Sequence, residues 1–125
     1  MGINIHVYSY WGVRTEWNKE FYDAYEAVED RNIEQYGYGK EPADAQVEVL
    51  MDGMSGEYMV FGERLYDSGD SRWGEMVNSN EVDIYPEKLD QMRHDYMEQF
   101  KLLYPGQYEW LAATPWRLVN LVHYS

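Results

Sequence analysis

The amino-acid sequence predicts a single α+β domain, spanning residues 1–125, with four strands and two helices. Three observations predict it. The first residues alternate between two faces, as they do in a β-strand. Two longer segments place apolar side chains at helical spacing. Short runs of strand-forming residues surround a cluster of turn-forming residues in the middle of the chain.

The opening stretch, residues 3–13, predicts a strand. Its odd positions begin with isoleucine and valine, and its even positions begin with asparagine, histidine and tyrosine. This is the period-2 pattern of a strand with two different faces. Both faces carry large or β-branched groups, so we expect both to be covered at least in part. The strand is therefore expected in the centre of a sheet rather than at its edge.

The segment from about Glu16 to Gln35 predicts the first helix. Thr15 can cap its first turn, and Gly37 and Gly39 end it. Apolar residues recur at helical spacing and would form its buried face: Trp17, Phe21, Ala24, Tyr25 and Val28.

A β-hairpin is predicted next. Residues 46–51 and 57–66 are typical of strands, and the turn-forming residues 52–56 join them. Gly62 indicates a bulge or a closely packed position in the second strand. The pattern of residues 72–85 favours no element.

The second helix is predicted to begin at Pro86, because proline is favoured at the first helical position. The pair Pro105-Gly106 ends it, and residues 107–114 predict one more helical turn. Residues 116–124 are β-branched and aromatic and predict a last strand. The apolar stripe of the helix holds Leu89, Met92, Tyr96, Phe100 and Leu103.

The predicted order is strand, helix, strand, strand, helix, strand. This order is that of the ferredoxin-like βαββαβ arrangement, with a four-stranded antiparallel sheet and two helices on one face. The first and third strands would be central, and the last would flank the first. The fold hosts many functions and decides none of them. The expected buried residues are Ile5, Val7, Trp17, Phe21, Val28, Val60, Leu89, Phe100 and Val119.

Charge is the strongest compositional signal. The chain carries 10 Lys and Arg against 23 Asp and Glu, for a net charge of −13. This charge repels nucleic acid and anionic membranes and favours a basic partner, although it also serves solubility. The chain has no cysteine, which excludes disulfides and thiolate chemistry and fits a reducing compartment. No secretion signal or membrane-spanning run is recognised, so we expect a cytoplasmic protein.

The predicted first helix carries a stripe of carboxylates opposite its apolar face. At about 5–6 Å between neighbours, they resemble the regular charge spacing of a nucleic-acid backbone. The alternative is a helix face that is merely solvated. The stripe consists of Glu16, Glu20, Asp23, Asp30 and Glu34, with Glu26 beside it.

Aromatic residues are the second functional feature. The chain has 13 Tyr and 5 Trp, more than one small core is expected to hold. Tyr and Trp are enriched at protein interfaces, where they bury a large area at low entropic cost. Tyr108 and Trp110 lie outside the predicted apolar stripes and are candidate partner-binding residues. They could equally cover the open sheet face or form a homodimer contact.

Histidines are the first candidates for metal binding or catalysis. His6 and His123 lie on strands predicted to be neighbours, so the two imidazoles could be close, but the sequence offers no obvious third ligand. His94 and Glu98 have an i, i+4 spacing on the second helix that suits metal or acid–base chemistry, although this spacing more often marks a surface pair.

Two carboxylates in one loop are the remaining candidates. Asp67 and Asp70 are followed by Arg72, without the further ligands that a calcium-binding loop needs. No phosphate-binding, nucleophile-elbow or zinc-protease motif occurs. We therefore expect no enzyme, no metal and no cofactor.

The sequence thus predicts an acidic cytoplasmic binding protein that inhibits a basic, nucleic-acid-handling target by imitating nucleic acid. The alternatives are a small enzyme or ligand-binding protein with a pocket on the sheet, and an immunity-type or oligomeric accessory protein. The composition resembles that of short bacteriophage proteins that bind host factors, and is similar to that of bacterial immunity proteins. The first resemblance implies a phage-encoded, anti-defence protein in the host cytoplasm.

Overall fold

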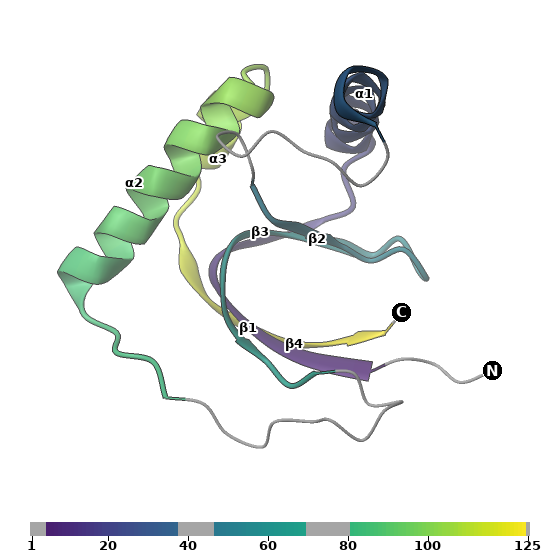
Figure 1. Ribbon diagram of the computed structural model, residues 1–125. Coiled ribbons are helices and arrows are strands. Elements are labelled where there is room, and N and C mark those ends of the chain that lie inside the picture. The colour runs from purple at the N-terminus through teal and green to yellow at the C-terminus, as the bar shows by residue number, and fades with distance from the viewer. Residues whose placement is uncertain (1–4, 38–46, 70–80, 125) are drawn as a thin grey trace.

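The computed structural model describes residues 5–37, 47–69 and 81–124, which form one four-stranded antiparallel sheet and three helices (Figure 1). The α+β class is confirmed. The third helix occupies the segment in which one further helical turn was expected. In chain order the elements are β1 (Ile5–Glu16), α1 (Lys19–Tyr36), β2 (Val49–Met51), β3 (Tyr58–Asp67), α2 (Pro86–Leu103), α3 (Tyr108–Ala113) and β4 (Arg117–Tyr124).

The strand order of the sheet is β2-β3-β1-β4, and each neighbouring pair is antiparallel. β1 lies inside the sheet, between β3 and β4, as its two-faced sequence predicted. The specific ferredoxin-like assignment stays a prediction, because the sheet is strongly curved and β2 contributes only three residues.

Two paired glycines lie where β1 and β3 approach each other closely. Gly12 is the register partner of Gly62. A side chain on Gly12 would collide with the carbonyl oxygen of Phe61, and one on Gly62 with that of Trp11. Gly62 also has a φ of +144°, which other residues rarely adopt. The close-packed position predicted at Gly62 is therefore confirmed, and it lets the backbones touch within a bent sheet.

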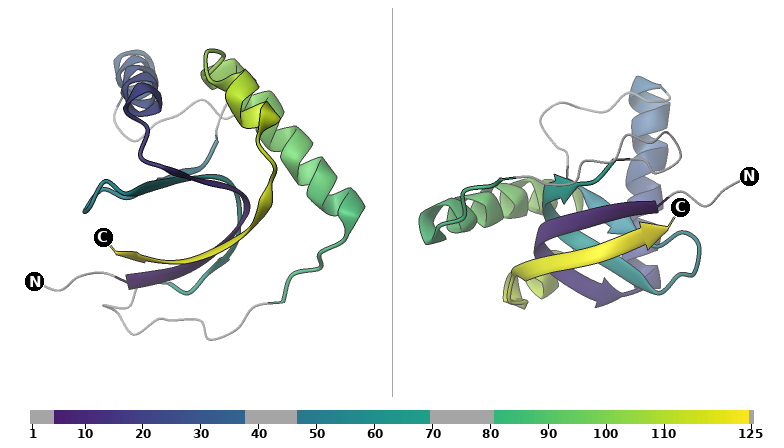
Figure 2. Two further views of the ribbon diagram at one scale, coloured as in Figure 1. Left: turned by 180° about the vertical axis from the view of Figure 1, so that it is seen from behind. Right: turned by 90° about the horizontal axis from the view of Figure 1, so that it is seen from below.

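The helices lie on the convex, outer face of the sheet (Figure 2). Phe21 of α1 packs against Phe61 of β3 at 4.8 Å between ring centroids and against Phe100 of α2 at 6.1 Å. All three side chains are fully buried. The concave, inner face carries a separate small cluster built on Tyr8, Tyr10 and Val60.

The first helix begins later than the sequence predicted. β1 stays paired with β3 as far as Glu16, opposite Tyr58, so the chain cannot turn into a helix at that point. Asn18, not Thr15, is the N-cap, and its Oδ1 atom accepts a hydrogen bond of 2.9 Å from the backbone N–H of Phe21. Gly37 follows the last helical residue, as expected.

The predicted core is right in part. Phe21, Val28, Val60 and Phe100 are buried, whereas Val7 is exposed. Val7 lies opposite Val122, which is also exposed, on a part of the outer face that no described helix covers. The other predicted core residues are half-buried: Ile5, Trp17, Leu89 and Val119.

No helix in the described part of the chain is long and apolar enough to cross a membrane.

Candidate protein-binding surface

The carboxylates predicted on the first helix all lie at the molecular surface. α1 rises from the sheet and projects beyond it (Figure 2). Glu16 is exposed, but it is the last residue of β1 and not part of the helix, which corrects its predicted place in the stripe. The remaining five, here called the acidic face, are exposed residues of α1: Glu20, Asp23, Glu26, Asp30 and Glu34.

Few cations offset this acidic face. Asp23 accepts a hydrogen bond of 3.0 Å from the Lys19 ammonium group, one turn earlier on the helix. Both side chains are more than half exposed, so this pair contributes little to stability. Elsewhere on the acidic face, no ion pair occurs within the described residues. The face is therefore a run of hydrated carboxylates that a basic surface could engage.

The two candidate aromatic residues lie on α3. Trp110 is 38% exposed, and its ring meets that of Phe61 edge to face at 5.4 Å. Tyr108 is half-buried, with the Lys101 ammonium 5.1 Å from its ring centroid. Because Phe61 also contacts Phe21, the base of α1 and Trp110 meet the same core side chain.

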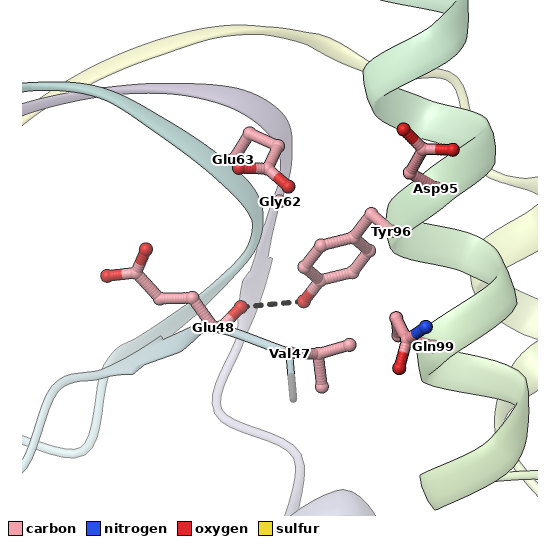
Figure 3. A pocket seen from close by; sticks show the side chains of 7 residues that line it. All are labelled: Val47, Glu48, Gly62, Glu63, Asp95, Tyr96 and Gln99. Atoms are coloured by element: carbon pink, nitrogen blue, oxygen red, sulfur yellow. Dashed lines mark hydrogen bonds between the residues drawn. The ribbon is translucent and has the colours of Figure 1, made fainter. Parts of the chain in front are cut away.

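A pocket of about 380 Å³ lies between β3 and α2 (Figure 3). The Tyr96 hydroxyl donates a hydrogen bond of 2.6 Å to the backbone carbonyl of Glu48. Burial, aided by the negative charge of Asp95, raises the pKa of the Glu63 carboxyl. A cationic side chain entering this pocket would offset the repulsion between the Glu63 and Asp95 carboxylates. Its lining consists of Val47, Glu48, Gly62, Glu63, Asp95, Tyr96 and Gln99.

Sequence reasoning did not identify this pocket. Glu63 lies in the middle of a strand and Asp95 in the middle of a helix, and only the tertiary structure brings them together. The only sequence feature that pointed near this pocket was Gly62, which lines it beside Glu63.

The inner face of the sheet holds a polar and aromatic network around Arg64. Its guanidinium group stacks on the ring of Tyr8 at 4.6 Å and pairs with Asp67 at 3.0 Å. It also pairs with Glu48. His6 joins the network through a 3.1 Å contact between its Nδ1 atom and Asp67.

The two predicted neighbours, His6 and His123, are direct register partners on β1 and β4. They do not share one site, because His6 contacts Asp67, whereas His123 lies 2.7 Å from the Tyr58 hydroxyl. Burial lowers the pKa of His123, and the Asp52 carboxylate opposes this shift. Within the described residues, no three histidine, aspartate or glutamate side chains are placed to hold a metal ion.

The other candidate groups do not form a site in the described structure. His94 and Glu98 form a 3.1 Å pair on α2, and both side chains are more than half exposed. Asp67 is used in the Arg64 network, while Asp70 and Arg72 lie outside the described residues.

Comparisons with protein-family models, with curated proteins and with solved structures return no match for this chain.

Proposed function

We propose that the protein binds a basic protein partner through the acidic face of α1 and thereby inhibits a nucleic-acid-handling target. The observation that carries this proposal is the exposure of all five carboxylates of the face on a helix that projects from the sheet.

The spacing of the charges supports a nucleic-acid-like mode of binding. From Glu20 to Glu34 the face extends about 21 Å, at 1.5 Å per residue. Lysine and arginine side chains that normally contact phosphates at about 3.4 Å axial spacing could instead reach these carboxylates. The surplus of negative charge on the whole chain would steer such a partner towards the helix.

Apolar anchors are available beside the charges. Trp110 and Tyr36 are exposed aromatic residues, the latter at the end of α1. Aromatic residues dominate the binding energy of many interfaces, whereas charges at the rim mainly set the association rate. The Glu63 pocket could additionally accept one lysine or arginine side chain of the partner.

A matched pair of variants tests this proposal. The first replaces the five carboxylates of the acidic face by Gln or Asn. The control replaces five exposed carboxylates elsewhere: Glu57, Glu81, Asp83, Glu87 and Asp90. A partner isolated from bacterial lysate with the wild-type protein should be retained by the control and lost by the first variant, and DNA should compete for it. Equal retention by both variants would contradict the proposal.

We also propose two finer points. The strand order and the antiparallel pairing support a curved version of the ferredoxin-like arrangement. A homodimer is supported by β4, an edge strand without a carboxylate in a chain of net charge −13. Its outward side chains Leu118, Val122 and Tyr124 are about half exposed, so a second copy could pair there without bringing carboxylates of the two strands together.

A further inference from the structure

A second pocket, of about 490 Å³, lies where β4 begins, against β1 and the segment that leads out of α3. Its charged lining residues are Arg14 and Arg117, and no carboxylate lines it. The Figure 3 pocket differs, since its charged lining residues are all acidic. Two cations at one pocket are unexpected in a protein with 13 more acidic than basic residues.

The strand register brings these arginines together. Arg117 pairs with Gly12, which is the last pair between β1 and β4, and β1 then continues to Glu16. Arg14 therefore lies two residues beyond the pair, with its guanidinium group 5.2 Å from the ring centroid of Tyr58. Both arginines are exposed, and neither forms an ion pair with a carboxylate of the described residues.

The remaining lining suits an anion with an apolar part. The Asn120 Oδ1 atom accepts a hydrogen bond from the Ser9 hydroxyl. The polar groups that Asn120 keeps for a ligand are therefore its two amide N–H donors. Val119, which is half-buried, supplies apolar wall. Guanidinium groups bind carboxylate and phosphate oxygens through paired hydrogen bonds, and pockets of roughly 300–1,000 Å³ are typical of small-molecule sites.

We propose that this pocket binds a small organic anion, with its phosphate or carboxylate group held by Arg14 and Arg117. The apolar part of the ligand lies against Val119. This site is separate from the acidic face and takes a ligand of opposite charge, so it does not depend on the proposed protein partner.

Calorimetric titration of the full chain at low salt tests the proposal. The probes are phenyl phosphate, benzoate and, as a cationic control, benzylamine. The expected result is that at least one anion binds, with the tighter anion identifying the acidic group of the ligand, and that any binding of benzylamine is unchanged when the two arginines are replaced. The variant R14Q/R117Q should bind that anion about tenfold more weakly or worse. R31Q, which removes an exposed arginine from α1, should bind it like the wild type.

Folding is checked from the unfolding midpoint of each variant. Should R14Q/R117Q not fold, R117Q alone replaces it, because that exposed side chain lies on the edge strand. R14K/R117K keeps both charges but loses the planar guanidinium groups that form paired hydrogen bonds, and it should bind the anion more weakly than the wild type. The proposal is overturned if neither anion binds the wild-type protein, or if removal of the arginines leaves anion affinity unchanged.

Discussion

The Tyr58 hydroxyl lies 2.7 Å from the Nδ1 atom of His123, although the two residues belong to opposite ends of the sheet. Tyr58 pairs with Glu16 at one end of β1, and His123 pairs with His6 near the other. Ten residues of extended strand would separate these ends by about 33 Å. The sheet must therefore curve back on itself, and the contact closes its inner face.

Protonation of His123 should weaken the fold. Burial lowers the pKa of His123, so the folded protein resists a proton that the unfolded chain accepts. Well above the ordinary imidazole pKa of about 6.5, His123 binds no proton in either state and has no effect on stability. As the pH falls through that value, proton uptake by the unfolded chain lowers the free energy of unfolding. Urea unfolding at about pH 7.5 and about pH 5.5 measures the difference.

Two histidine variants separate this effect from the titration of other groups. H123Q should show a smaller loss of stability between the two pH values than the wild type. H94Q removes an exposed histidine on α2 and should keep the wild-type loss. An equal pH dependence in H123Q and the wild type would show that His123 is not responsible.

Alanine at either paired glycine should destabilise the protein by about 2 kcal/mol or more, or prevent folding. G12A drives a methyl group into a backbone carbonyl, and G62A also requires a φ that alanine rarely adopts. The control is G106A, where nothing lies within 4 Å, and it should change stability by about 0.5 kcal/mol at most. Urea unfolding of the three variants provides the comparison, and a mild effect at Gly12 would contradict the close approach of the strands.

Removal of the helix cap should cost about 1 kcal/mol. N18A loses the side chain that accepts from Phe21, whereas N18D keeps an acceptor and adds a favourable charge at the helix N-terminus. Thermal unfolding should therefore rank N18A below both N18D and the wild type. If N18D were as unstable as N18A, Asn18 would not act as the cap.

Pairing between two copies at β4 should depend on its exposed side chains. Sedimentation analysis at increasing concentration should show a dimer, and V122K should shift it to monomer. L102K changes an even more exposed leucine on α2 and should leave the dimer intact. A protein that stays monomeric at all concentrations would argue against this contact.

The sequence predicted the structure correctly where the spacing of apolar and polar residues within one element decides it. The helical period placed the exposed acids of α1 correctly, because that helix contacts the core through only one face. Glu16 was misplaced, since the pairing of β1 with β3 overrides helix formation there. Val7 was misjudged because alternation reveals two faces but not which part of each is covered.

Contacts between distant segments could not be predicted in the same way. The Tyr58–His123 contact depends on the curvature of the sheet, and the spacing of apolar residues along a strand does not reveal that curvature. The meeting of Arg14 with Arg117 depends on the register between β1 and β4, which places Arg117 opposite Gly12. Each residue alone looks like an ordinary strand residue.

The most direct test of the central claim is the salt dependence of the association rate with the isolated partner. Screening shortens the Debye length from about 30 Å at 0.01 M salt to about 8 Å at 0.15 M. The wild-type protein and the five-carboxylate control should therefore associate fast at low salt and slow steeply as salt rises. The variant with the neutralised acidic face should associate slowly at low salt and respond weakly to salt. An unchanged rate and an unchanged salt dependence in that variant would contradict the claim that the acidic face of α1 binds the partner.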